Sequence, residues 1–359
     1  MAYPEVREDV LRCARLEIPS RVPCFPIGVM YDFHHFGYSH RAWRERPEIM
    51  VDVGVRAVRE FDYDIYMLHP DDLLEYEDIG IGIRFDDEIP PAVERYLAPE
   101  ADVLSSFRLP DEGAFKKGRL AAYLEGIRGL KREFGDSVLL VGRVAAPFTT
   151  MSVIFGIEAS MFLMLEDPGF FRSCEAFFLE YNSIVAEAIL DSGADAIWLG
   201  DCVATSYFIS PAQFRDLAAS YAAELSTRLR KRHGIVFYHG GEISIPHLEI
   251  AATLPFDSVN VGYGVDLAPV KAAIGKRMCV MGNLDTIRDL GQKSEAEVFG
   301  ITGRMVEAGK EDGGYIFCTG EGVVHSTPVG NIHAMVRAVR EHGRYGARPE
   351  TSARSWVAP

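Results

Sequence analysis

Eight short apolar runs alternate with longer stretches of helical period, and this alternation constrains the fold more than any other feature of the chain. Runs this apolar are typical of parallel strands that are buried on both faces. They cover residues 22–29, 64–68, 138–144, 195–199, 235–238, 258–261, 278–281 and 315–318. Amphipathic stretches lie between most of them, at residues 47–61, 114–134, 168–192 and 211–233. Strands joined by helical crossovers predict an α/β fold, a closed parallel (β/α)8 TIM barrel.

The length of the chain, 359 residues, fits one such barrel as a single domain. Residues 77–90 alternate and turn, which predicts an antiparallel excursion from the barrel. No internal repeat or low-complexity linker marks a second domain. We therefore expect a barrel domain over residues 1–346, followed by a mobile C-terminal tail over residues 347–359.

Charge and cysteine usage limit the partners and the compartment. The formal net charge is −15, and a surface this acidic repels nucleic acid and anionic lipid. No apolar run approaches the ~20 residues of a membrane-spanning helix, and the N-terminal residues are too charged for a signal peptide. The six cysteines form no CxxC pair, which favours reduced thiols over a disulfide framework. We expect a cytoplasmic protein without nucleic-acid or membrane partners.

Polar side chains follow most of the predicted strands. In a TIM barrel, the residues just past the C-terminal ends of the strands face the substrate, so we expect the active site there. These residues are Tyr31, Asp32, His34, His35, His69, Asp71, Asp72, Arg143, Asp201, Cys202, His239, Glu242, Asn260, Asn283, Asp285, Cys318 and Glu321.

Several blocks of sequence resemble the uroporphyrinogen decarboxylase-like superfamily. The clearest are GADAIWLGDCVATSYFISPAQF (residues 193–214), FDSVNVGYGVDLAPVKAAIGKRMCVMGNLD (256–285) and EDGGYIFCTGEGVVHSTPVGNIHAMV (311–336). VGRVAAPFTTMSVIFG (141–156) and LLEYEDIGIGIRFDDEIPPAVE (73–94) match further blocks. The blocks occur in the expected order and span nearly the whole chain, and the TIM barrel is the fold that the resemblance implies.

The superfamily contains two large branches, and one of them fits this chain poorly. Its founding decarboxylases hold the carboxylates of a tetrapyrrole with arginines that follow the first strand. The corresponding stretch here, GVMYDFHHFGYSH (residues 28–40), contains no arginine. A ligand with many carboxylates would meet no compensating cations there. The resemblance therefore favours the other branch, the zinc-dependent methyltransferases that exchange methyl groups with a corrinoid protein.

The zinc motif of that branch is altered here. Its thiol-methylating members bind zinc through His-x-Cys after the fifth strand and a Cys after the eighth. His239 matches the histidine, whereas Gly241 and Glu321 replace the cysteines. The resemblance implies zinc on His239 and Glu321, with a further donor from Glu242, Cys318 or Asp201. Fewer thiolates make zinc a stronger Lewis acid, which suits a departing oxygen. Without a metal, His239 would instead bond a backbone carbonyl, and Glu321 would pair with an arginine.

An aromatic pocket is the expected substrate site. Aromatic walls with a few polar anchors suit a methoxylated ring, although half of these residues would be ordinary core residues on the alternative interpretation. The candidates are Tyr31, Phe36, Tyr38, Phe148, Tyr207 and Tyr238, with Asn283 as a polar anchor. His34 and His35 could give a proton to a phenolate leaving group, or could be hydrogen-bonded loop residues. Asp201 and Arg143 complete the candidate catalytic set, with Asp201 as a proton acceptor or a support for the metal site.

These residues and the resemblance together predict a component of a corrinoid-dependent O-demethylase. It would move a methyl group from a methoxylated, aromatic substrate to the cobalt of a partner corrinoid protein. Two alternatives remain open. One is a metal-independent decarboxylase or lyase that uses Asp201 and Arg143 on a small carboxylate. The other is a binding protein without catalytic activity. The resemblance also leads us to expect a homodimer.

Overall fold

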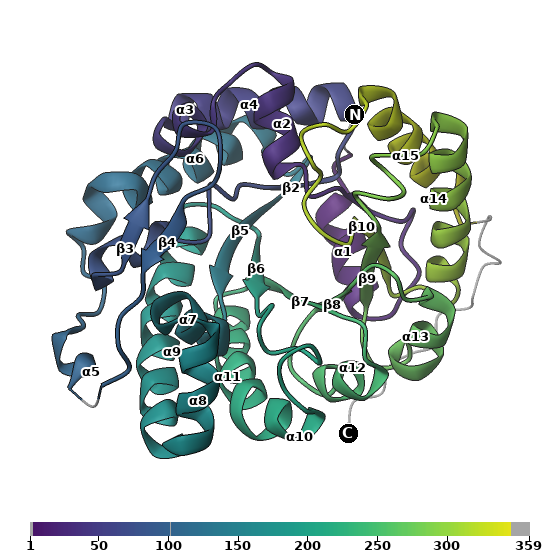
Figure 1. Ribbon diagram of the computed structural model, residues 1–359. Coiled ribbons are helices and arrows are strands. Elements are labelled where there is room, and N and C mark those ends of the chain that lie inside the picture. The colour runs from purple at the N-terminus through teal and green to yellow at the C-terminus, as the bar shows by residue number, and fades with distance from the viewer. Residues whose placement is uncertain (1–2, 101, 346–359) are drawn as a thin grey trace.

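The predicted strands form the wall of a barrel. A computed structural model describes residues 3–100 and 102–345 of the chain, so the predicted tail at residues 347–359 lies outside the described part. An eight-stranded parallel sheet has the order β1-β10-β9-β8-β7-β6-β5-β2 (Figure 1). Its strands are β1 (Cys24–Phe25), β2 (Ile65–Met67), β5 (Leu139–Ala145), β6 (Ala196–Gly200), β7 (Ile235–Glu242), β8 (Ser258–Val261), β9 (Val280–Leu284) and β10 (Tyr315–Thr319). Each lies within, or overlaps, one of the eight predicted runs.

The barrel is nearly closed between β1 and β2. The Asp64 amide donates to the carbonyl of Cys24 at 3.1 Å, and the Cys24 amide donates to the Asp64 carboxylate at 2.9 Å. Arg21 and Arg340 both pair with that buried carboxylate, at 2.6 Å each. One side chain thus joins the two ends of the sheet, and the predicted TIM-barrel fold class is confirmed.

A ring of helices surrounds the strands (Figure 1). α4 (Pro47–Phe61) has the predicted bounds, and the predicted helices at residues 114–134, 168–192 and 211–233 are found with small changes at their ends. The helices are α1 (Val6–Ala14), α2 (Val29–His35), α3 (His40–Glu45), α4, α5 (Val103–Ser106), α6 (Gly118–Phe134), α7 (Pro147–Phe155), α8 (Ile157–Glu166), α9 (Pro168–Asp191), α10 (Pro211–Gln213), α11 (Ala219–Lys231), α12 (Ile245–Ala251), α13 (Leu267–Ile274), α14 (Glu295–Lys310) and α15 (Val329–His342). Shorter turns of helix are η1 (Leu74–Ile79), η2 (Ala114–Lys116) and the π-helical η3 (Phe214–Ala218).

The antiparallel excursion is present between β2 and β5. It pairs β3 (Gly82–Arg84) with β4 (Ala92–Arg95), so its second strand lies just beyond the predicted stretch. Figure 1 shows this hairpin outside the barrel, beside α6.

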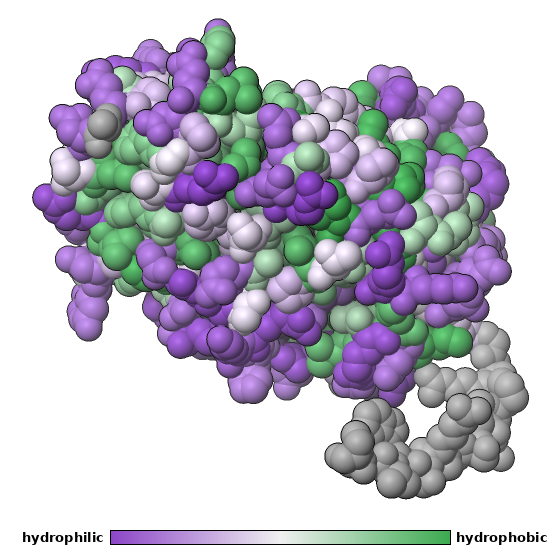
Figure 2. Space-filling model, turned by 90° about the horizontal axis from the view of Figure 1, so that it is seen from below, coloured by the Kyte–Doolittle hydropathy of each residue, from purple (hydrophilic) through white to green (hydrophobic). Residues whose placement is uncertain are grey.

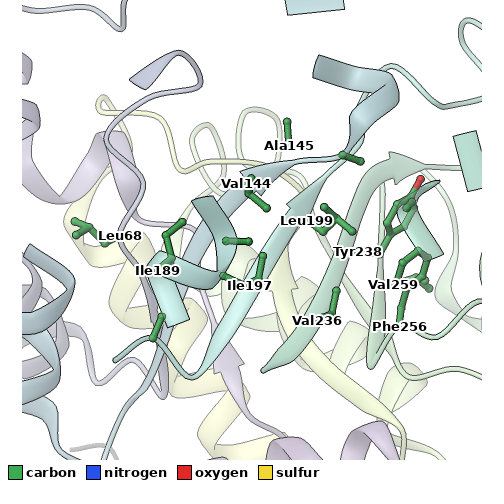
Figure 3. Packing of buried hydrophobic residues seen from close by; sticks show 14 of the residues in the cluster. Leu68, Val144, Ala145, Ile189, Ile197, Leu199, Val236, Tyr238, Phe256 and Val259 are labelled. Carbon is green, nitrogen blue, oxygen red and sulfur yellow. The ribbon is translucent and has the colours of Figure 1, made fainter. Parts of the chain in front are cut away.

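The core has two layers, because successive strand residues point to opposite faces. Inward side chains such as Val141, Trp198 and Phe237 pack together inside the barrel. Outward side chains pack against the helices, as Figure 3 shows for Val144 and Ile197 beside Ile189 of α9. The parity along each strand therefore decides which side chains reach the barrel interior.

The N-terminal end of the barrel is covered by α1. Val6, Val10 and Cys13 of this helix join the cluster of inward-facing strand residues, and the Cys13 thiol donates to the carbonyl of Tyr315 at 3.3 Å. The opposite end, where the strands terminate at their carboxyl ends, is left for a binding site.

The helices and the surface carry mixed polarity. In residues 3–100 and 102–345, no single helix is long and apolar enough to cross a membrane, and α7 and α8 pass that test only together, across a bend of 115°. Figure 2 shows one face of the molecule, on which hydrophobic residues gather in small patches between polar ones.

Candidate functional site

A pocket of about 380 Å³ opens among the carboxyl ends of the strands. It is bounded by the segments that follow β1, β2, β6 and β10, by β5 and β7 themselves, and by α7. The lining residues are Ile27, Val29, Met30, Met67, His69, Pro70, Asp71, Asp72, Pro90, Arg143, Thr149, Val153, Trp198, Gly200, Cys202, His239, Glu321 and Gly322.

Strand parity and one glycine create this pocket. Arg143 of β5 stands in register with Trp198 of β6, and Gly200 stands in register with His239 of β7. All four lie on the inward face of their strands and line the pocket. Gly200 contributes no side chain, and a Cβ added there would lie 3.9 Å from the Arg143 Nε and Nη2 atoms. The space beside the guanidinium therefore exists because residue 200 is glycine.

Arg143 is a buried cation held between two carboxylates. Its Nη1 donates to Glu75 Oε1 at 2.7 Å, and its Nη2 lies 2.8 Å from Asp72 Oδ1. Burial lowers the pKa of Arg143, but Asp72 and Glu75 outweigh this effect and raise it. Burial raises the pKa of Glu75 to about 7 in spite of the arginine. The arrangement fixes a permanent positive charge on the pocket wall.

Asp72 joins this arginine to a histidine. His69 Nε2 lies 3.2 Å from the Asp72 Oδ1 atom that Arg143 also contacts. Burial would raise the pKa of Asp72, but Arg143 and His69 hold it well below its usual range. Asp72 is therefore an anion that balances the charge of Arg143 at the pocket mouth.

His239 lies opposite Arg143 and is oriented from behind. Its Nδ1 lies 2.8 Å from Asn260 Oδ1, and its ring packs against Trp198 with the centroids 4.6 Å apart. Its Nε2 lies 3.8 Å from Glu321 Oε1, whose side chain is half exposed. Burial lowers the pKa of His239, but Cys202, Glu321 and the hydrogen bond to Asn260 raise it to about 9. His239 is thus an imidazolium at neutral pH.

Asp201, a predicted catalytic residue, lies behind the pocket wall. Its carboxylate is fully buried and accepts hydrogen bonds from the Thr149 hydroxyl at 2.9 Å and the Tyr238 hydroxyl at 2.8 Å. Burial raises the pKa of Asp201 to about 6 against these two hydrogen bonds. Thr149 lines the pocket and Asp201 does not, so Asp201 is placed to position Thr149 rather than to contact a ligand.

The four predicted zinc ligands do not converge. The Glu242 carboxylate accepts hydrogen bonds from the Ser206 amide and hydroxyl and from the amides of Ile243 and Ser244. The Cys318 thiol is buried next to the Asn260 amide, and burial raises its pKa well above the usual value. Neither residue lines the pocket.

His239 and Glu321 do face each other, but a third donor is missing from the position where the family motif would place one. A Cβ added to Gly241 would lie 3.1 Å from Glu321 Oε1 and 3.9 Å from His239 Cε1. The three positions of the zinc motif therefore meet in space, and one of them holds only hydrogen. In the described part of the chain, no three His, Cys, Asp or Glu side chains are grouped so that they could hold a metal ion. The donor set does not fit zinc.

The expected aromatic wall is corrected by the structure. Tyr31 packs against His35, Phe36 against Arg56, and Phe148 against Phe171. The Tyr38 hydroxyl donates to Asp52, Tyr207 is 68% exposed, and Tyr238 stacks on Phe256 (Figure 3). None of these six lines the pocket, and Trp198 is the only Phe, Tyr or Trp among its described lining residues.

Three further predicted residues also lie outside the pocket. His34 packs against His325 with the ring centroids 5.1 Å apart, and His35 pairs with Glu60 at 2.7 Å. Asn283 donates to the carbonyls of Gly262 and Val265 and faces a separate outer hollow of about 650 Å³. These side chains stabilise the loops around the barrel mouth.

Of the predicted site residues, the structure brings Arg143, His239 and Glu321 into one pocket. The candidate set omitted Cys202, His69 and Asp72, although their positions after β6 and β2 marked them, and it omitted Thr149 and Trp198. The signal that finds Trp198 is strand parity, because Trp198 and His239 are inward neighbours of Gly200.

Comparison with known proteins places the chain in a family. Residues 5–342 match the family model "Uroporphyrinogen decarboxylase (URO-D)". The chain belongs to this family. Among its relatives are uroporphyrinogen decarboxylases of Anaeromyxobacter dehalogenans, 26% identical over 93% of this chain and 98% of the relative, and of Carboxydothermus hydrogenoformans, 28% identical over 85% and 86%. A solved structure, a methyltransferase from Methanosarcina mazei, superposes with a TM-score of 0.83 at 21% identity, covering 94% of this chain and 98% of that one. That structure establishes the shared fold.

Proposed function

We propose that this member of the uroporphyrinogen decarboxylase family is the demethylating component of a corrinoid-dependent O-demethylase. It would take a methyl group from a small methoxylated substrate and pass it to the reduced cobalt of a separate corrinoid protein. The observation that carries the proposal is the His239 imidazolium, whose Nε2 lies at the pocket beside Glu321 while Asn260 holds Nδ1.

An imidazolium at this place supplies what ether cleavage requires. When the methyl group leaves, the oxygen accumulates negative charge, and a positioned acid that protonates it lowers the barrier. With a pKa of about 9, His239 holds its proton at pH 7. No metal is needed for this step, because the acid is a side chain of the protein.

The pocket walls fit a compact, partly apolar substrate. Met30, Met67 and Val153 contribute apolar surface, and Trp198 contributes one indole ring. A volume of about 380 Å³ is at the small end of the range for ligand sites, roughly 300–1,000 Å³. One methoxylated ring or a similar small molecule suits this space better than a tetrapyrrole does.

The balance of charge also disfavours a ligand with many carboxylates. Two cations, Arg143 and His239, face the pocket together with two carboxylates, Asp72 and Glu321. Arg143 is already paired with Asp72 and Glu75. A neutral or singly charged substrate needs no further cations.

The test is methyl transfer to a free corrinoid. The purified chain would be incubated with a panel of methoxylated aromatic and aliphatic compounds and with cob(I)alamin, and methylcobalamin and the demethylated product would be followed by absorbance and mass spectrometry. We expect turnover with one class of compound. Replacement of the acid in His239→Gln should lower kcat by roughly 10²–10⁴-fold. His333→Gln, which changes an exposed histidine on α15, is the matched control. Equal rates in His239→Gln and the control would contradict the proposal.

Decarboxylation of a small carboxylate is the second candidate, and the Arg143 cation favours it. Relatives of this chain are named uroporphyrinogen decarboxylases, and Arg143 could hold a single substrate carboxylate on the pocket wall. Release of CO₂ from small carboxylates without any methyl transfer, abolished in Arg143→Met, would replace the demethylase proposal.

A further inference from the structure

Side chains from three consecutive strands meet at the base of the pocket. Cys202 follows β6, His239 lies in β7 and Asn260 lies in β8, where it stands in register with His239. Asn260 is 1% exposed, and its Oδ1 accepts the Nδ1 proton of His239 at 2.8 Å. An amide oxygen is an acceptor only, so Nδ1 is held protonated and the Nε2 atom is the one that exchanges protons with the pocket.

Cys202 differs from every other cysteine of the chain. All six cysteines lie in the described residues, and Cys202 alone is exposed while the other five are buried. It lines the pocket together with His239 and Arg143. Cys202 is also the leading electrostatic and hydrogen-bonding partner that raises the pKa of His239. The thiol is therefore accessible to a ligand and stands beside two cationic side chains.

A thiol beside an imidazole that an amide orients is an arrangement of nucleophilic cysteines. Such thiols are activated by an adjacent histidine, and neighbouring cations favour the reactive form. The third group orients the base, as Asn260 does here. The demethylation proposed above places a methyl electrophile in the same pocket.

We propose that Cys202 is the nucleophile that receives the methyl group before the corrinoid does. In the first step the sulfur forms a bond to the methyl carbon while the carbon–oxygen bond breaks. The thiol proton passes through His239 Nε2 to the departing oxygen, leaving S-methylcysteine and an alcohol or phenol. In the second step the electron pair of reduced cobalt forms the new bond to carbon, the carbon–sulfur electrons stay on sulfur, and the Cys202 thiolate is restored.

This sequence of steps rests on the proposed function, but the reactivity of the thiol can be measured separately. The full-length protein would be treated with methyl 4-nitrobenzenesulfonate, a methyl donor that needs no ether cleavage, and the modified peptides would be mapped by mass spectrometry. We expect one added CH₂, on the peptide that contains Cys202. Subsequent addition of cob(I)alamin should remove it. His239→Gln should slow the labelling by about 10²-fold, whereas Cys318→Ala, which changes a buried thiol outside the pocket, should not.

The second measurement is demethylation of a methoxylated substrate without corrinoid. Wild-type protein should release one equivalent of alcohol or phenol and stop with Cys202 methylated, and Cys202→Ser should release none. Cys202→Ser that transfers methyl groups to cob(I)alamin at the wild-type rate would overturn this inference while leaving the proposed function intact. So would labelling of a cysteine other than Cys202. If Cys202 is labelled by the sulfonate but wild-type protein demethylates no methoxylated compound, the proposed function fails and the nucleophilic thiol remains.

Discussion

Glu175 on α9 is a buried carboxyl group with no visible compensation. Its side chain is 0% exposed, and neither of its oxygens has a hydrogen-bond partner in the described part of the chain. Burial, followed by the nearby Asp201 carboxylate, raises the pKa of Glu175 from 4.5 to about 9. The folded protein therefore holds this group protonated at neutral pH.

The cost of that proton follows from linkage. Between the unfolded pKa of 4.5 and the folded pKa of about 9, the folded state binds a proton that the unfolded state has lost, so stability falls as pH rises. Each pKa unit corresponds to about 1.4 kcal/mol, and 2.5 units separate pH 4.5 from pH 7, so Glu175 costs about 3 kcal/mol at pH 7. Glu175→Gln has nearly the same shape and does not titrate. We expect it to stabilise the protein by about 3 kcal/mol at pH 7, and by about 1.4 kcal/mol more for each further pH unit up to pH 8.

Urea unfolding of wild type and Glu175→Gln at pH 6, 7 and 8 measures this difference. Glu187→Gln, an exposed position on the same helix that faces Arg232 at 3.6 Å, is the matched control and should change stability by less than about 1 kcal/mol without a trend in pH. A Glu175→Gln protein that is no more stable than wild type, or whose advantage is the same at all three pH values, would refute the reasoning. It would mean that Glu175 is ionised in the folded state.

Three further predictions concern the pocket. Wild-type kcat should fall as pH rises through about 9, where His239 loses its proton, and Asn260→Ala should move this limb to lower pH because it removes a hydrogen bond that favours the imidazolium; an unmoved limb in the kcat–pH profile would exclude His239 as its source. Elemental mass spectrometry of protein purified without chelators should find far less than one zinc per chain, whereas one zinc per chain that disappears in His239→Gln would show that a third ligand exists. Gly200→Val should raise KM because its methyl groups enter the space beside Arg143, whereas Gly200→Ala, whose Cβ makes only ordinary contact at 3.9 Å, should bind substrate nearly normally in calorimetry.

The fold was predictable because long-range topology and local pattern agree in a barrel of this kind. Each buried strand is a continuous apolar run, and each crossover has a helical period, so the order of elements follows from the sequence. The limits of α4 were predicted to the residue, since Pro47 starts the helix and Phe61 precedes a left-handed residue, Asp62. The second strand of the outer hairpin fell beyond its predicted stretch, where polar residues give little periodic signal.

The site was only partly predictable, because a position after a strand does not settle where a side chain points. Inward parity takes Arg143, Trp198 and His239 into the pocket, and the same parity turns Tyr238 outward onto Phe256. The candidate set selected His239 and Tyr238 together, although neighbouring residues of one strand cannot share a face. Asp201 is another such case, and its carboxylate reaches Tyr238 behind the wall.

The aromatic residues after β1 could not be placed from the pattern alone. They were expected in a loop that faces the substrate, but α2 begins at Val29. The first residues of that helix, Val29 and Met30, line the pocket. Tyr31 lies on another side, where it packs against His35 and Phe61. The direction of a short helix that follows a strand depends on tertiary packing, which outweighs local preference.

The altered zinc motif has a structural logic that links its two substitutions. Gly241 adopts φ +62°, a conformation that favours glycine, at the bulge that ends the pairing of β7 with β8. A cysteine there would be strained, and its Cβ would lie only 3.1 Å from Glu321 Oε1. The glycine and the carboxylate are therefore compatible with each other, and neither would readily accept the ancestral thiol alone. With the metal-binding positions changed together, the Nε2 atom of His239 is free to carry a proton, and the chemistry of the pocket depends on that proton and on the thiol of Cys202.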